Sequence, residues 1–472
     1  MSGDLCPYPE YAEPAVFELG SIPSHWEERR AKFYMREVDE RSRSGAEAQL
    51  SVSHLTGVRP RRHKNVTMVA ASYAGHKLCH PGDVVVNTMW AWMAALGVSP
   101  ETGLVSPSYG VYRLRAPQTF DPVYLDRLLR LPAYAYEYRV NSTGVTSSRL
   151  RLYADKFLNI ALVRPPIEEQ RAIVKHVWHV EREVGAAIRA KQRMISLLTE
   201  LKRVTVQQVI FGGLGQASQL SAGSIDPQDL PDSWDAPPLK AVASIQSGIT
   251  LGKDYSGKKV YEYPYLRVAN VQAGRLSLDS VSTIHIPKSE AARSTLQKGD
   301  VLMTEGGDPD KLGRGCVWDD EISDCLHQNH VFAVRPQVRL NPYFLTEVLG
   351  TVYAQTYFLL SSKQTTNLAS TNKTKIGAFR VPLPPLEEQQ GILQELTSKV
   401  TPIGVAIQRA EREISLLREY QIRLTADVVT GKLDVRSAAA ALPDVDPHDP
   451  GPAAYDADEE GLDGDDLTEE SM

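Results

Sequence analysis

The amino-acid sequence contains an internal repeat, and a repeat of this kind constrains the fold more than any other feature of the chain. The segment PPIEEQ at residues 165–170 returns as PPLEEQ at residues 384–389, which is 219 residues later. At the same shift ISLL occurs at residues 195–198 and 414–417, and the segment VIFGGL, which begins at Val209, is matched by VVTGKL. These matches in one ungapped register predict that the same structural unit is built twice.

Each repeated segment is predicted to form a long helix. Two prolines precede it and two glutamates occupy its first turn, where their negative charge complements the helix dipole. Gly212 and Gly431 follow the last apolar positions, which is typical of a helix that ends on a left-handed residue. A helix of ~43 residues would be ~65 Å long at ~1.5 Å per residue.

The second copy of the repeat has apolar residues at alternating spacings of three and four, the pattern of a coiled-coil seam. The seam residues are Leu393, Leu396, Val400, Ile403, Ile407, Ala410, Ile414, Leu417, Gln421, Leu424 and Val428. The first copy has the weaker series Val174, Val177, Val184, Ile188, Ile195 and Leu198, interrupted by Glu181, Lys191 and Lys202. A narrow seam on so long a helix needs a partner helix, so we expect the two copies to pack against each other.

A less similar region precedes each helix. Both regions open alike, with IPSHW at residues 22–26 and LPDSW at residues 230–234. Both then contain a Gly-Asp pair before an apolar run, and later a short β-like segment. Between these anchors the sequences diverge and are rich in Gly, Thr, Asn and Val, which indicates mixed α/β globular domains with irregular loops.

The expected architecture is therefore of the α/β (α+β) class, with two globular domains and two long helices that pack against each other as a coiled coil. The predicted segments are an N-terminal extension (1–20), a first globular domain (21–164), a central helix (165–215), a linker (216–229), a second globular domain (230–383), a C-terminal helix (384–436) and an acidic tail (437–472).

The net charge of −6 is concentrated at the end of the chain. Residues 437–472 hold 12 of the 58 Asp and Glu residues and no Lys or Arg, so the remaining 46 acidic residues face all 52 basic ones. The tail has too little apolar surface to offset the entropy of ordering and is predicted to be disordered. The body is mildly basic, which permits DNA binding without requiring it.

The sequence predicts neither a membrane span nor a secretory signal, since it has no apolar run of roughly 18 residues. The four cysteines are scattered without a C-x-x-C pair, which argues against a zinc site or a disulfide framework and favours a reducing cytoplasm.

No complete catalytic motif is present. The segment GITLGK (residues 248–253) lacks one residue of the phosphate-loop spacing, and LNPYF (residues 340–344) lacks the second proline of an adenine-methyltransferase loop, so a turn before a helix is favoured there. Two histidine pairs lack a third ligand, so core or surface roles are favoured over a metal site. We therefore expect no catalytic residue and no metal in this chain.

Several polar loops have the residue types that contact DNA, namely amides, hydroxyls and basic groups near glycine or threonine. A solvated loop or a core position explains many of these residues equally well. The DNA-contact candidates are Asn87, Trp90, Ser108, Tyr109, Asn141, Arg149, Arg151, Lys311, Arg314, Gln328, Asn329, Lys363, Gln364, Asn367 and Lys373.

The twin P-P-[IL]-E-E-Q motifs, the IP-x-x-W opening and the ending VVTGKLDVR together resemble the specificity subunits of type I restriction–modification enzymes over about residues 20–436. GDVVVNTMWAW with VSPSYGVYR, and GRGCVW with NHVFAVRP, resemble segments of that family's target-recognition domains. The resemblance implies two target-recognition domains, each reading one half of a bipartite, asymmetric double-stranded DNA site. It also implies that the two long helices pack as an antiparallel coiled coil, which gives a pseudo-twofold molecule and separates the two domains.

The resemblance also implies partners. It implies that two methyltransferase subunits and two restriction (motor-nuclease) subunits bind, and that S-adenosylmethionine, ATP and magnesium belong to those partners. It places Glu168, Gln170, Glu387 and Gln389 at the methyltransferase interface, although a role in starting the helix explains these residues equally well.

Other functions remain open at this stage. A recognition scaffold in another phage-defence system would use the same fold, and neighbouring genes would distinguish it. A self-sufficient methyltransferase would need the methyl-donor loop and the complete N-P-P-[YF] motif that are missing. A purely structural coiled-coil protein would leave the two inserted domains unexplained.

Overall fold

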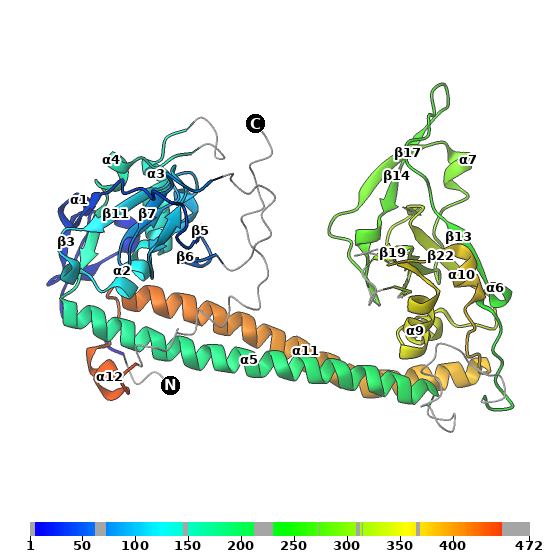
Figure 1. Cartoon of the computed structure of the whole chain (residues 1–472). Coiled ribbons are helices and arrows are strands. Elements are labelled where there is room, and N and C mark those ends of the chain that lie inside the picture. Colours follow the sequence, from blue (N-terminus) through cyan, green and yellow to red (C-terminus); the bar gives the residue numbers. More distant parts are fainter. Residues whose placement is uncertain are drawn as a thin grey trace. The chain divides into compact units, whose positions relative to one another are not determined.

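The computed structural model describes residues 5–61, 72–144, 150–211, 230–272, 274–307, 312–313, 315–364 and 369–445. The chain divides into two compact units: unit 1 is residues 1–191 with 413–472, and unit 2 is residues 192–412 (Figure 1). Each unit contains one β-rich domain and a part of each of two long helices. The predicted mixed α/β class with two domains and two long helices is confirmed.

The two long helices are α5, Ile167–Phe211, and α11, Leu386–Val429. They contain 45 and 44 residues, close to the predicted length. Each begins directly after the Pro-Pro pair and has its two glutamates in the first turn, as expected. Gly431, just beyond α11, has the predicted left-handed backbone, with φ of 77°.

The helices run antiparallel inside each unit. In unit 1, Val177 near the start of α5 shares a core with Val428 near the end of α11, and Lys191 forms an ion pair with Glu413. In unit 2, the last residues of α5 share a core with the first turns of α11. All the predicted seam positions of α11 are buried or half-buried, so the seam is confirmed.

The domain of unit 1 is built on a four-stranded antiparallel sheet in the order β4-β11-β8-β9. Smaller antiparallel pairs surround it: β1-β2, β3-β12, β5-β6 and β7-β10. The strands are β1 Tyr11–Ala12, β2 Ile22–Pro23, β3 Glu27–Arg30, β4 Met35–Glu37, β5 Leu50–Ser53, β6 Gly57–Pro60, β7 Lys77–Cys79, β8 Val84–Val86, β9 Leu96–Val98, β10 Gly103–Val105, β11 Gly110–Leu114 and β12 Ala161–Arg164.

The domain of unit 2 repeats this sheet, in the order β13-β22-β18-β20, again antiparallel throughout. A second sheet, β17-β14-β21, and the small sheet β19-β24-β23 are added to it. The strands are β13 Ala243–Ser247, β14 Tyr261–Leu266, β15 Val271–Gln272, β16 Arg275–Leu276, β17 Ser282–Ile286, β18 Val301–Thr304, β19 Gly306–Gly307, β20 Gly315–Val317, β21 Leu326–His327, β22 Val331–Pro336, β23 Lys363–Gln364 and β24 Ala369–Ser370.

Matching short helices cover the two sheets. Helix α2 (Pro122–Leu129) begins on Asp121 and α8 (Pro342–Leu349) begins on Asn341; each capping side chain accepts two backbone N–H groups and a proline follows it. The predicted turn before a helix at LNPYF is thereby confirmed. The other helices are α1 Ala31–Tyr34, α3 Pro132–Asn141, α4 Ala154–Phe157, α6 Leu239–Val242, α7 Lys288–Ala291, α9 Val352–Ser361, α10 Lys373–Ala378 and α12 Arg436–Ala441.

The C-terminal end of the described chain differs from expectation. Residues 436–441 form α12 where an unstructured tail was expected from residue 437, because the alanine-rich segment favours a helix and Ala439 is buried. Asp444 then pairs with Lys175 of α5 at 2.8 Å. The N-terminal extension is also packed, with Tyr8 3% exposed.

Candidate nucleic-acid interface

The main sheets of the two units have the same buried ion pair at the same end. In unit 1, Arg113 donates from Nε and Nη2 to Asp83, both at 2.8 Å. In unit 2, Arg335 makes the same two bonds to Asp300, at 2.7 and 2.8 Å. The aspartate side chains are 2% and 0% exposed, and their hydrogen bonds raise the pKa of both arginines. These pairs hold one end of each sheet in the same geometry.

The opposite end of each sheet differs between the units, and we call it the loop edge. In unit 1 the loop edge lies where β8 ends and β11 begins, around Asn87, Thr88, Ser108 and Tyr109. Asn87 Nδ2 donates to the Tyr109 hydroxyl at 2.9 Å, and Thr88 Oγ1 donates to the Ser108 carbonyl at 3.1 Å. The predicted contact residues Asn87, Ser108 and Tyr109 are therefore brought together.

A third segment of unit 1 joins this loop edge. The Leu152 N–H donates to the Thr88 carbonyl at 2.9 Å, and the Arg151 guanidinium lies 3.6 Å from the Met89 sulfur. Arg151 is exposed, while Trp90 in the neighbouring turn is half-buried. Two more of the predicted residues thus lie at the unit 1 loop edge, and Arg151 supplies a positive charge there.

Asn141 is the last residue of α3, and its side chain is engaged by its own helix. Its Nδ2 donates to the Glu137 carbonyl at 2.9 Å. The strand-like residues Thr143 and Arg151 that follow exchange two backbone hydrogen bonds of 2.9 Å. The structure therefore places Asn141 at the base of the loop that carries Arg151.

The loop edge of unit 2 has a different pair of side chains at the equivalent positions. Glu305 lies five residues after Asp300, as Thr88 lies five after Asp83, and His330 lies five before Arg335. The His330 Nδ1 atom is hydrogen-bonded to the Glu305 carboxylate, and the Glu305 N–H donates to the His330 carbonyl at 2.8 Å. The equivalent positions thus have hydroxyl groups in unit 1, with the buried amide of Asn87 bonded to Tyr109 beside them, and a carboxylate with an imidazole in unit 2.

The predicted residues Gln328 and Asn329 form the turn just before His330. Their backbone N–H groups donate to Leu266 and Ile249 at 2.9 and 3.0 Å, so the turn is anchored on two neighbouring segments. Both side chains are half-buried at the loop edge of unit 2.

A small sheet extends this edge. Strand β19 pairs with β24, which pairs with β23, and the Thr371 N–H donates to the Glu305 carbonyl at 2.7 Å. Of the predicted residues here, Lys363 and Gln364 form β23, and Lys373 is exposed at the start of α10. Arg149, Lys311, Arg314 and Asn367 lie outside the described residues.

The glutamines of the two P-P-x-E-E-Q motifs link segments within their own unit by hydrogen bonds, and we call them glutamine staples. Gln170 Oε1 accepts the Asp121 N–H at 2.8 Å, and its Nε2 donates to the Pro165 carbonyl at 2.8 Å. Gln389 makes the same bonds, both at 2.8 Å, to Asn341 and to the carbonyl of the proline before its helix. Both side chains are 0% exposed, which fits the alternative role in starting the helix, and a place at the methyltransferase interface stays a prediction. Each one ties the long helix to the short capped helix of its own domain.

The first glutamates of these motifs, Glu168 and Glu387, are exposed on the first turn of their helices. Glu168 contacts Arg171 of the same helix at 2.7 Å. Their exposure leaves them open to a partner, which remains a proposal.

The second glutamates hold the tryptophans of the domain openings. Trp26 Nε1 donates to Glu169 at 2.8 Å, and Trp234 Nε1 donates to Glu388 at 2.9 Å. Glu169 is 4% exposed, whereas Glu388 is exposed. The repeated motifs therefore join each domain to its helix, with different burial in the two units.

The burial in unit 1 comes from the two ends of the chain. Tyr8 donates to Glu169 at 2.5 Å, and His25 Nε2 lies 2.9 Å from the same carboxylate. The Arg436 guanidinium lies over the Tyr8 ring, 5.2 Å from its centroid. Burial, together with the Glu169 carboxylate, raises the pKa of Tyr8, so its phenol remains a hydrogen-bond donor.

Reasoning from sequence missed several residues that build these sites. The Asp–Arg pairs were missed although both Gly-Asp anchors had been noted, because the arginines are about thirty residues further along the chain. Once the pairs are known, Thr88 and Glu305 can be located five residues after the aspartates, and His330 five residues before Arg335. The Trp–Glu contacts join two motifs that the sequence showed separately.

The structure contains neither a candidate membrane helix nor a metal-binding group within the residues that it describes. Those residues include no helix that is both long and apolar enough to cross a membrane. They also include no group of three or more His, Cys, Asp or Glu side chains that could hold a metal ion.

The fold and these sites define a class of protein: a duplicated binding module with a constant frame, divergent loop edges and a pair of antiparallel helices. The family model of the type I restriction modification DNA specificity domain matches residues 231–403. A chain from the solved structure on complex assembly and conformational transition of the type I R-M system has 17% identity and a TM-score of 0.59, and covers 87% of this chain and 99% of that chain. That likeness supports the fold.

Curated relatives carry the same description. The putative type I restriction enzyme MjaX specificity subunit of Methanocaldococcus jannaschii is 24% identical over 39% of this chain and 43% of its own length. The MjaVIII specificity subunit of the same organism is 23% identical over 67% of this chain and 71% of its own. The EcoBI specificity subunit of Escherichia coli is 23% identical over 56% of each chain. The aligned regions thus span about half of two of these relatives.

Residues 231–403 thus match the type I restriction modification DNA specificity domain, and the chain is similar to specificity subunits of type I restriction–modification enzymes. Specificity subunits are the non-catalytic members of those enzymes.

Proposed function

We propose that this chain reads a split, asymmetric DNA sequence, with the loop edge of unit 1 contacting one half and the loop edge of unit 2 contacting the other. The observation that carries this proposal is that one frame is built twice and presents different chemistry. The frame is repeated in the Asp–Arg pairs, the sheet order and the glutamine staples. Two domains with the same framework but different contact groups are suited to bind DNA in the same way while each recognises a different base sequence.

The contact groups at the two edges suit DNA in type as well as in place. Hydroxyl, amide and imidazole groups can meet base edges, and the exposed Arg151 and Lys373 can meet phosphates. The predicted residues that lie outside the described part of the chain, Arg149, Lys311, Arg314 and Asn367, remain part of this proposal.

We further propose that two methyltransferase subunits dock on the long helices. The helices expose apolar pairs one turn apart at repeat-related positions: Leu197 and Leu201 on α5 are 59% and 51% exposed, and Leu416 and Tyr420 on α11 are 53% and 44% exposed. Residues four apart lie on one helix face. An exposed apolar pair repeated at the same shift of 219 residues supports two copies of one partner.

In this proposal the chain performs no chemistry. Two restriction subunits would join the methyltransferases in the cytoplasm, and S-adenosylmethionine, ATP and magnesium would be bound by those partners. The bipartite product would be N6-methyladenine in each half of the site.

A base-resolution methylome tests the proposal directly. Cells with this gene and its neighbouring methyltransferase gene should show a split, adenine-methylated motif that disappears when only this gene is removed. An unchanged methylome, with the methyltransferase expressed, would overturn the proposal in favour of a recognition scaffold in another defence system. In vitro, affinity for duplex DNA should fall steeply with salt, because several phosphate contacts release counterions.

A further inference from the structure

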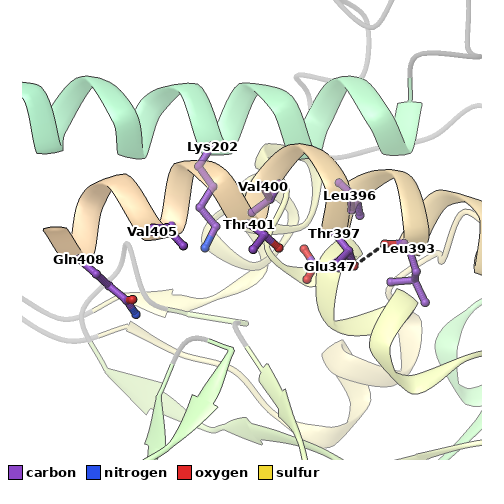
Figure 2. Close-up of a pocket in the computed structure, with 10 residues that line it drawn as sticks. Lys202, Glu347, Leu393, Leu396, Thr397, Val400, Thr401, Val405 and Gln408 are labelled. Carbon is purple, nitrogen blue, oxygen red and sulfur yellow. Dashed lines mark hydrogen bonds between the residues drawn. The ribbon is translucent and has the colours of Figure 1, made fainter.

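A groove in unit 2 lies between the two long helices and α8. Its volume is about 410 Å³, and Leu396 and Val400 of α11 contribute to its apolar lining. Figure 2 shows Lys202 entering it from α5 and Glu347 from α8. The groove therefore combines an apolar wall with two charged side chains.

Glu347 is poorly compensated in this groove. Burial raises the pKa of its carboxyl, and Lys202 opposes that shift from nearby. Within the described part of the chain, no ion pair or hydrogen bond reaches the carboxylate. Thr397 beside it donates its hydroxyl to the Leu393 carbonyl at 2.8 Å, which leaves the Thr397 oxygen as an acceptor (Figure 2). The groove therefore offers acceptors and needs donors.

The equivalent place in unit 1 is filled. Arg127 has the position in α2 that Glu347 has in α8, and Glu181 precedes Val400 by the repeat shift of 219 residues. Arg127 Nη2 lies 2.6 Å from Glu181, whose side chain is 5% exposed. Unit 1 thus fills this place with an arginine–carboxylate pair of its own, whereas unit 2 has Glu347 at the position of the arginine and Val400 at the position of the carboxylate.

We propose that this groove binds an arginine-bearing, otherwise apolar segment of one methyltransferase subunit. An arginine suits this groove because its planar guanidinium can pair with a carboxylate through two hydrogen bonds, and the corresponding place in unit 1 also holds an arginine–carboxylate pair, Arg127 with Glu181. The linker after α5, residues 212–229, contains no Lys or Arg and cannot supply that charge. The proposal rests on the proposed function, and it makes the two methyltransferase sites unequal: one has this groove and the other does not.

The test is the stoichiometry and affinity of the complex between the full chain and the methyltransferase subunit encoded beside it. Isothermal titration and native mass spectrometry would compare wild type, E347Q and E347R. We expect two copies to bind wild type, and one of them to bind about tenfold more weakly to E347Q, since one partner of a desolvated charge pair is lost. The E347R variant should bind that copy more weakly still, because like charges then face each other.

A transplant variant and a matched control complete the test. The double variant E347R/V400E introduces the arginine–carboxylate pair of unit 1 into unit 2, so it should fold with an unchanged melting temperature. It should nevertheless bind only one copy of the methyltransferase subunit. E262Q removes a charge from the exposed Glu262 of unit 2 and should bind both copies as wild type does.

Two results would overturn the inference and leave the proposed function standing: wild-type affinity of both copies for E347R, or equal weakening of both copies by it. If wild type itself binds no methyltransferase, the proposed function fails and the inference falls with it.

Discussion

Unit 1 and unit 2 have the same framework of sheet, short helix and long helices, but they differ in how the contacts around it are buried and filled. Both hold their main sheet with a buried Asp–Arg pair and tie their domain to a long helix through a glutamine and a Trp–Glu bond. In unit 1 the chain termini cover the Trp–Glu bond, and Arg127 fills the cleft beside the helices. In unit 2 Glu388 of the corresponding bond is exposed, and the groove beside the helices is open.

This difference separates two kinds of position. Positions that are buried and hydrogen-bonded in both units maintain the fold, because a change there would leave polar groups unpaired away from water. Positions that differ between the units are available for recognition, and they lie at the loop edges and beside the helices.

The largest expected effect concerns the shared frame. R113A and R335A each remove one partner of a buried charge pair, which should lower the stability of the affected unit by about 3–5 kcal/mol. Hydrogen exchange measured by mass spectrometry would read the two units separately. Similar losses confined to the mutated unit are expected; a loss below about 1 kcal/mol in either unit would contradict an equal structural role for the two pairs.

The next effect concerns the loop edges. E305A should change base preference in one half of the DNA site, and T88A in the other, each by about 1–3 kcal/mol, as single lost base contacts do. Binding to duplexes altered in one half at a time would measure this, with E262Q as a control of equal charge loss to E305A. If a single variant weakened the base preference in both halves of the DNA site, the assignment of one unit to each half would be wrong.

A smaller and unequal effect is expected at the Trp–Glu bonds. E169Q disturbs a buried carboxylate with three neighbours and should cost about 1–2 kcal/mol, whereas E388Q at an exposed site should cost less than about 0.5 kcal/mol. Tryptophan fluorescence during urea unfolding, with hydrogen exchange to assign the unit, would show the difference. Deleting residues 1–9 should remove most of the difference between the two variants in lost stability. Equal losses for E169Q and E388Q in the full chain would contradict the protective role of the N-terminal segment.

The smallest effect concerns Glu347. Because burial raises the pKa of this carboxyl above its ordinary value, its charge opposes folding once the pH rises past the unfolded value of 4.5. E347Q should therefore stabilise unit 2 by roughly half a kcal/mol at neutral pH, and the gain should vanish below the unfolded pKa. Melting temperatures at pH 7 and pH 4 would check this. A loss of stability at pH 7 would mean that Glu347 is satisfied within the chain.

The sequence by itself determined the plan of this protein. The repeat, the prolines, the paired glutamates and the terminal glycines predicted two long helices, and the heptad pattern predicted which face of α11 is covered. These signals are local and periodic, so each can be read within one segment of the chain. Residue types alone also led to Asn87, Tyr109, Gln328 and Asn329, which the structure places at the two loop edges; their contact with DNA stays a prediction.

Only the tertiary structure decided what these residues do. It turned Gln170 and Gln389 into internal staples, joined Asp83 to Arg113, and placed Glu305 beside His330. It also showed that one repeat position is filled by Arg127 and the other open at Glu347. Such contacts join residues far apart in the chain, and burial is a property of all the neighbours together, so no local pattern records them.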